Sequence, residues 1–132
     1  MGRWGEPETD SLVEASRGAI EQAYAPYSNF KVGAAVMGAS GRIYSGCNVE
    51  NASYGLSVCA ERVAIFKAVS EGETEIKAIA IANSTGKPAF PCGACRQVMA
   101  EFAPDGMEIY LVSDEGVEKY MLAELLPHAF KL

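Results

Sequence analysis

The chain has 132 residues, of which 49% are hydrophobic and 21% are charged, and its formal net charge is −6. This length suits one domain of about 100–150 residues, and the hydrophobic fraction excludes a wholly disordered chain. The excess of acidic residues argues against a nucleic-acid partner, because binding phosphates needs clustered cations. No hydrophobic run approaches the ~18 residues of a membrane span, and the start of the chain lacks a signal pattern. We therefore expect one domain over residues 1–132, located in the cytoplasm, with a small-molecule partner and no membrane contact.

The chain is expected to open with an arm and a helix. Residues 1–9 are polar, contain glycine and proline, and predict a loose N-terminal arm. Hydrophobic residues then recur at three- and four-residue steps, which predicts an amphipathic helix over residues 9–24. Ser11 and Glu14 fit a capping box near its start, and Pro26 is expected to end it.

The rest of the chain alternates between strand-like and helix-like segments. The run IKAIAIA is almost continuously hydrophobic, as expected of a strand that is covered on both faces. The first two strands are joined by a short Gly-Ala-Ser-Gly turn and predict a hairpin. The expected strands are residues 30–37, 42–48, 76–82, 107–112 and 116–121. The expected helices run from residue 58 or 59 to residue 70, over residues 92–102 and over residues 122–126. This order predicts an α/β fold with a mixed sheet and helices on its faces.

The sharpest local motif is PCGAC, which places Cys92 and Cys95 at the start of a predicted helix. On a first helical turn this spacing brings two sulfurs to one face, where they can share one ion. The positive end of the helix dipole favours the thiolate form of both side chains. A single C-x-x-C motif leaves three interpretations open: half of a metal site, a redox pair or two buried cysteines.

Cys59 also lies at a predicted helix start, in CAERVAIF, and favours the metal interpretation. If the two helix starts converge, three thiolates face one point and leave a fourth position for water, as in a catalytic zinc site. Glu61 would then be able to exchange protons with that water. Cys47 is the remaining cysteine, and as a fourth ligand it would make the site merely structural. It lies on a predicted strand, so we expect it not to be a ligand.

Several segments together resemble the cytidine deaminase family. They are AYAPYSNFKVGAA, NVEN at residues 48–51, CAERVAIFKAVSEG, PCGACRQV and ELLPHAF. The resemblance is to the small zinc-dependent type with three cysteine ligands, and it spans roughly residues 23–130. It implies a three-layer α-β-α sandwich around a five-stranded mixed sheet, one Zn²⁺ per subunit and a homotetramer. It also implies hydrolytic deamination of cytidine and 2′-deoxycytidine in pyrimidine salvage.

The resemblance further implies roles for individual residues. Cys59, Cys92 and Cys95 match the zinc ligands, and Glu61 matches the catalytic proton shuttle. The positions matching substrate contacts are Phe30 beside the pyrimidine, Asn48 and Glu50 at the ribose hydroxyls, and the Ala60 backbone at the base. Phe130 matches an aromatic side chain that enters the pocket of a neighbouring subunit.

Three thiolates on one zinc ion leave a net charge of −1, which would weaken zinc as a Lewis acid. Arg62 follows Glu61 and is expected to offset this charge by hydrogen bonds to Cys59 or Cys92.

Two other functions remain open from the sequence. A structural zinc module that binds partners would use four sulfurs and hold no water. A deaminase could instead act on an aminated nucleoside antibiotic or on a base in a polynucleotide. Asn48 and Glu50 favour a free sugar, and the acidic charge disfavours a polynucleotide.

Overall fold

The computed structural model describes residues 6–103 and 106–128. Five strands form one sheet in the order β2-β1-β3-β4-β5. They are β1 (Val32–Gly38), β2 (Ile43–Cys47), β3 (Ile76–Asn83), β4 (Glu108–Ser113) and β5 (Gly116–Met121). The helices are α1 (Glu6–Ala19), η1 (Ile20–Gln22), η2 (Tyr54–Leu56), α2 (Ala60–Ser70), α3 (Gly93–Glu101) and α4 (Leu122–Leu125).

The sheet is mixed, as predicted. Strands β3 and β4 run parallel, and the other neighbouring pairs run antiparallel. The β1–β2 hairpin and the hydrophobic central strand β3 are confirmed, and β3 is buried along almost its whole length. In the part of the chain that the structure describes, no helix is long and hydrophobic enough to cross a bilayer.

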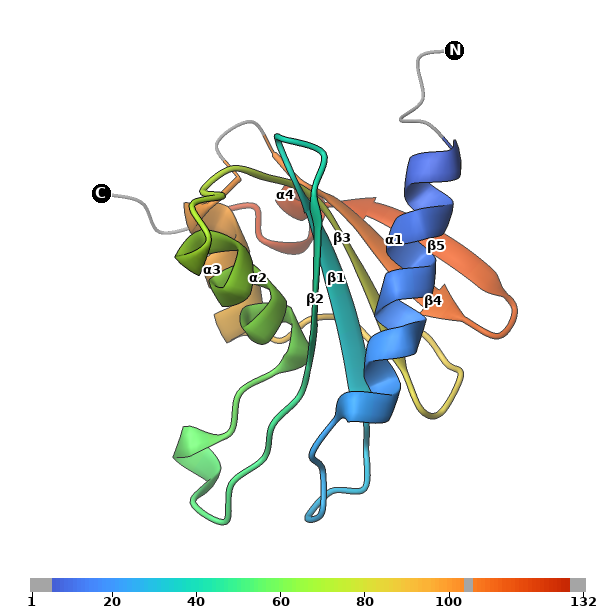
Figure 1. Cartoon of the computed structure of the whole chain (residues 1–132), viewed down its shortest axis with the longest axis vertical. Helices are drawn as coiled ribbons and strands as arrows, with labels where there is room; N and C mark the ends of the chain where they lie inside the picture. The colour runs from blue at the N-terminus through green and yellow to red at the C-terminus, as the bar shows by residue number, and fades with distance from the viewer. Residues whose placement is uncertain (1–5, 104–105, 129–132) are drawn as a thin grey trace.

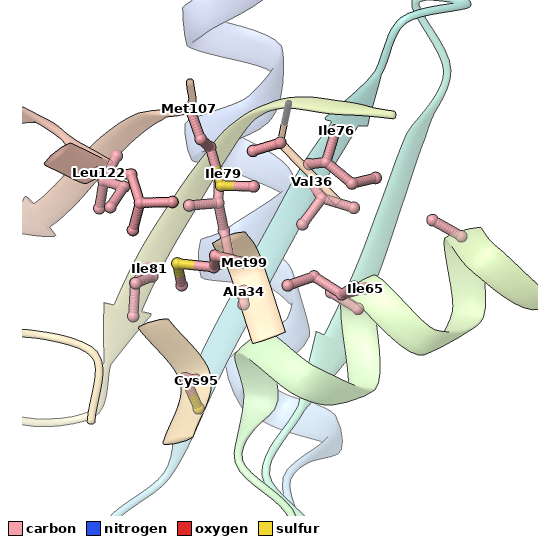
Figure 2. Packing of buried hydrophobic residues seen from close by; sticks show 14 of the residues in the cluster. Ala34, Val36, Ile65, Ile76, Ile79, Ile81, Cys95, Met99, Met107 and Leu122 are labelled. Carbon is pink, nitrogen blue, oxygen red and sulfur yellow. The ribbon is translucent and has the colours of Figure 1, made fainter. Parts of the chain in front are cut away.

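Helices cover both faces of the sheet, which confirms the three-layer arrangement (Figure 1). Side chains of α2, α3 and α4 pack with one face of the central strands in the larger core, which contains Ile65, Met99 and Ile79 (Figure 2). On the opposite face, Leu12 of α1 packs over the small side chains of β1 and β3. Cys95 belongs to the larger core, so one sulfur of the predicted metal site is fixed by hydrophobic packing.

The first helix differs from the prediction at both ends. It begins at Glu6, so the expected arm overlaps its first turn, and Ser11 lies inside it rather than at a cap. The predicted capping box of Ser11 and Glu14 is therefore wrong. Pro7 is compatible with this earlier start, because backbone N–H groups in a first turn have no partner within the helix. The helix ends at Ala19 and continues as the 3₁₀ turn η1.

Gly46 lets α2 lie directly on β2. A Cβ atom at this position would lie 2.5 Å from the backbone nitrogen of Ala64 and 3.0 Å from the carbonyl oxygen of Ala60. No side chain fits in that space, so the missing Cβ fixes how closely the N-terminal half of α2 approaches the sheet.

We expect Gly46→Ala to destabilise the fold by about 1–3 kcal/mol, because the added methyl group must push α2 away from β2. Gly18→Ala is the matched control: a Cβ there meets nothing within 4 Å, and alanine should stabilise α1 by about 0.5–1 kcal/mol. Urea denaturation of both variants measures the difference. Equal unfolding midpoints for the two would contradict the close contact.

Candidate zinc and catalytic site

The first residues of α2 and α3 bring three cysteines together. Cys59 and Cys92 are the N-cap residues of these helices, each with an extended backbone, and Cys95 lies in the first turn of α3. Both helices therefore begin one residue after a cysteine. The positive ends of their dipoles point toward the sulfurs and favour thiolate there.

The sulfur atoms are spaced as a single metal ion requires. Cys92 Sγ lies 3.4 Å from Cys95 Sγ and 4.0 Å from Cys59 Sγ, and all three atoms lie within 4.8 Å of one another. Tetrahedral zinc with Zn–S bonds of about 2.3 Å places its sulfurs about 3.8 Å apart. Three soft sulfur donors at this spacing fit zinc. Cys47 lies in β2 and is not part of this cluster, as expected.

The sulfurs hold protons unequally. A hydrogen bond from Cys95 and contact with Arg62 lower the pKa of the Cys59 thiol to about 5. The same bond to Cys59, together with burial, raises the pKa of Cys95. Within this pair, the thiolate form is thus favoured at Cys59 and disfavoured at Cys95. Because three thiolates this close together repel, a cation is needed to hold all of them in the anionic form.

Arg62 contacts this cluster through one arm of its guanidinium. Its Nη2 donates to Cys59 Sγ over 3.6 Å, which is one of the two contacts expected from the sequence. Its buried Nε has no hydrogen-bond partner among the residues that the structure describes. The guanidinium thus places a fixed positive charge beside the sulfurs, where it lowers the charge that they present to a metal ion.

Glu61 is a buried carboxyl group in the first turn of α2. Its side chain is only 6% exposed, two residues after Cys59. Burial raises the pKa of Glu61 to about 7. A carboxyl group with such a pKa accepts and returns protons readily at neutral pH. Ala60, beside it, is fully buried.

Asn48 and Phe30 lie side by side, on segments distant in sequence. Asn48 Oδ1 accepts the Val32 N–H at 2.8 Å, and its Nδ2 donates to the Phe30 carbonyl oxygen at 2.8 Å. Asn48 therefore holds the loop that carries Phe30, a contact that the sequence did not reveal. This loop replaces the first two residues of the strand expected from residue 30, so β1 begins at Val32.

Glu50 holds the same loop at Tyr27 and Ser28, just before Phe30. Its Oε1 accepts the backbone N–H groups of Tyr27 and Ser28 at 3.0 and 3.1 Å, and its Oε2 accepts the Ser28 hydroxyl. These bonds lower the pKa of the Glu50 carboxyl, the Ser28 hydroxyl most strongly. Beside it lies a pocket of about 320 Å³, lined by Tyr27, Ser28, Glu50, Tyr54 and Ser57.

Sequence reasoning missed two side chains of this region, Ser28 and Arg96. Arg96 donates through Nε to the Pro91 carbonyl oxygen at 2.8 Å and through Nη1 to the Leu125 carbonyl oxygen at 2.9 Å. It thereby fixes the peptide just before Cys92 against the end of α4. An arginine or a serine alone carries no sequence signal for such contacts.

Phe130, which the resemblance matches to a residue that enters a neighbouring subunit, lies outside the described residues.

Comparisons with known proteins agree with this site. The family model described as "Cytidine and deoxycytidylate deaminase zinc-binding region" matches residues 7–111. A cytidine deaminase of Sporosarcina psychrophila is 50% identical over 124 residues, which are 93% of this chain and 91% of the relative. One of Halalkalibacterium halodurans is 50% identical over 120 residues, or 90% of this chain and 91% of the relative.

Solved structures show the same architecture. The crystal structure of a cytidine deaminase from Burkholderia pseudomallei superposes with a TM-score of 0.86 at 49% identity, covering 92% of this chain and 98% of that one. The enzyme from Mycobacterium tuberculosis gives a TM-score of 0.81 at 39% identity, over 94% and 98% of the two chains. The family match spans strands β1 to β3, the first part of β4 and both cysteine-bearing helices. The chain therefore belongs to the cytidine and deoxycytidylate deaminase family.

Proposed function

We propose that the chain is a zinc-dependent hydrolase that deaminates cytidine and 2′-deoxycytidine to uridine and 2′-deoxyuridine and releases ammonia, a step of pyrimidine salvage. The observation that carries this proposal is the buried carboxyl group of Glu61 beside the cluster of Cys59, Cys92 and Cys95. A structural zinc site needs no buried acid, whereas hydrolysis needs one to move protons. The named activity of the relatives supports the same reaction.

Cys59, Cys92 and Cys95 are the zinc ligands in this proposal, with one ion per subunit. The bound ion would supply Lewis acidity, which makes water a nucleophile near neutral pH. Glu61 takes a proton from the attacking water and passes it to the ring nitrogen beside the reacting carbon. It then moves the second proton to the departing amino group. Water oxygen thus replaces nitrogen on the ring, and ammonia leaves.

The pocket beside Glu50 favours an uncharged sugar over a phosphate. Among the described residues, the pocket beside Glu50 is lined by one carboxylate, two tyrosines and two serines, and by no lysine or arginine. A phosphate near this pocket would be repelled by the carboxylate, and none of these lining residues would neutralise its charge. In this proposal Asn48 and Glu50 bind the sugar hydroxyls, Phe30 packs beside the base, and the Ala60 backbone contacts the base.

We further propose that the whole chain is one catalytic domain that works in the cytoplasm as a homotetramer. Exposed hydrophobic side chains near the sugar side support the assembly: Tyr54 is 81% exposed and Leu56 67%. A neighbouring subunit would cover such residues. Phe130 would enter the pocket of a neighbour.

We expect the purified protein to deaminate cytidine and deoxycytidine in an ultraviolet absorbance assay. Cytidine 5′-monophosphate should react with a kcat/KM lower by at least about tenfold, because the carboxylate in this pocket repels a phosphate and none of the described lining residues is a cation. No absorbance change with either nucleoside would contradict the proposed function.

Glu61→Gln tests the proton transfer itself. The amide keeps the size of the side chain but cannot accept the proton, so turnover should fall by about 10²–10⁴-fold while zinc content is unchanged. Metal analysis and kinetics on the same preparation provide both numbers. Turnover close to that of the wild-type protein would exclude Glu61 as the proton shuttle.

Arg62→Ala should weaken zinc binding and turnover by about 10–100-fold, because Cys59 loses its charged hydrogen-bond donor. Zinc loss to a chelator and steady-state kinetics measure the two effects. Arg42→Ala, at an exposed position in the β1–β2 turn, is the matched control and should change neither. Unchanged zinc affinity and turnover in Arg62→Ala would remove Arg62 from the site.

A further inference from the structure

The hydroxyl group of Ser28 links Glu50 to Phe30, two residues that the proposed function assigns to nucleoside binding. It donates to Glu50 Oε2 and accepts the backbone N–H of Phe30 at 3.0 Å. One oxygen atom therefore links the carboxylate and the aromatic residue that the proposed function assigns to the sugar and the base. Asn29, between Ser28 and Phe30, has a φ of 59°, the left-handed conformation that asparagine tolerates better than most residues. This turn directs the Phe30 N–H back to Ser28.

The two oxygens of Glu50 are used differently. Oε1 accepts two backbone N–H groups of the loop, which occupy its two acceptor positions. Oε2 accepts only the Ser28 hydroxyl among the described residues, so one of its acceptor positions stays available. Glu50 and Ser28 both line the pocket of about 320 Å³. Oε2 is thus the oxygen that remains free for a ligand hydroxyl.

We propose that Ser28 is a positioning residue that holds Glu50 Oε2 in place to accept a 2′ or 3′ hydroxyl of the nucleoside sugar. This inference rests on the proposed function, because that function makes the sugar the ligand of Glu50. Without the Ser28 hydroxyl, the carboxylate is still tied at Oε1 but free to rotate about that contact. Loss of the Ser28 hydroxyl should therefore weaken binding of the sugar and leave the reaction at the base unchanged.

The test compares nucleosides with and without the 2′ and 3′ hydroxyls of the sugar. In Ser28→Ala, the KM for cytidine should rise about tenfold, since one hydrogen bond to a charged group is lost, while kcat stays within about twofold. The KM for 2′,3′-dideoxycytidine should not rise, because that nucleoside lacks the 2′ and 3′ hydroxyls and keeps only the 5′ hydroxyl. Ser28→Thr keeps the hydroxyl and should restore the KM for cytidine.

Ser40→Ala is the matched control. Ser40 donates its hydroxyl to Glu73 in the same way, at the β1–β2 turn, the opposite end of β1 from the Ser28 loop (Figure 1). Removing the Ser40 hydroxyl should change the free energy of unfolding about as much as removing the Ser28 hydroxyl does. It should leave the KM values for both nucleosides unchanged. An equal rise in KM for both nucleosides in Ser28→Ala, or no rise for either, would overturn the proposal.

Calorimetry separates this inference from the proposed reaction. Uridine and 2′,3′-dideoxyuridine need no turnover, and Ser28→Ala should weaken the binding of uridine alone. If the wild-type protein binds uridine more tightly than 2′,3′-dideoxyuridine but deaminates no nucleoside, the proposed reaction is wrong. The role of Ser28 is then still tested by the Kd values of Ser28→Ala for the two ligands. If the wild-type protein binds uridine and 2′,3′-dideoxyuridine equally well, the proposed role of Ser28 is wrong.

Discussion

The site depends on how the protein keeps three sulfur atoms within 4.8 Å of one another. Two unit charges 4 Å apart repel by about 4 kcal/mol at an effective dielectric constant of about 20, so three thiolates need compensation. Two helix N-termini supply about half a positive charge each, and Arg62 supplies one more. These contributions offset about two of the three negative charges. About one negative charge is then left for a divalent ion to neutralise, so the ion would keep more of its power as a Lewis acid than beside three uncompensated thiolates.

This arrangement requires two helices to begin at one place, and the fold provides it through backbone contacts. Gly46 lets α2 lie directly on β2, which fixes the position of Cys59 and Glu61. Arg96 ties the peptide before Cys92 to the end of α4. Hydrophobic packing of Cys95 in the larger core fixes the third sulfur. The region proposed to bind the sugar is held differently, because there Asn48 and Glu50 hold a loop by hydrogen bonds from its backbone. The cysteine cluster is thus positioned by packed helices, and the proposed sugar-binding residues are positioned by a hydrogen-bonded loop.

The sequence predicts the parts of this structure that depend on periodicity and local motifs. The strands, the helices after residue 58 and the cysteine cluster follow from hydrophobic patterns and from two motifs at helix starts. The predicted start of α1 is too late, because Ser11 and Glu14 give a capping signal that the acidic and proline-containing turn before them overrides. Ser28, Arg96 and the loop contacts of Asn48 could not be predicted. Each joins segments far apart in the chain, and single polar residues carry no pattern that identifies a distant partner.

X-ray absorption of the zinc-loaded protein, with metal analysis of the same sample, tests the central claim most directly. The arrangement of Cys59, Cys92 and Cys95 predicts one zinc ion per chain with three sulfur neighbours and one oxygen neighbour. A protein that binds no zinc, or an ion surrounded by four sulfurs, would contradict it.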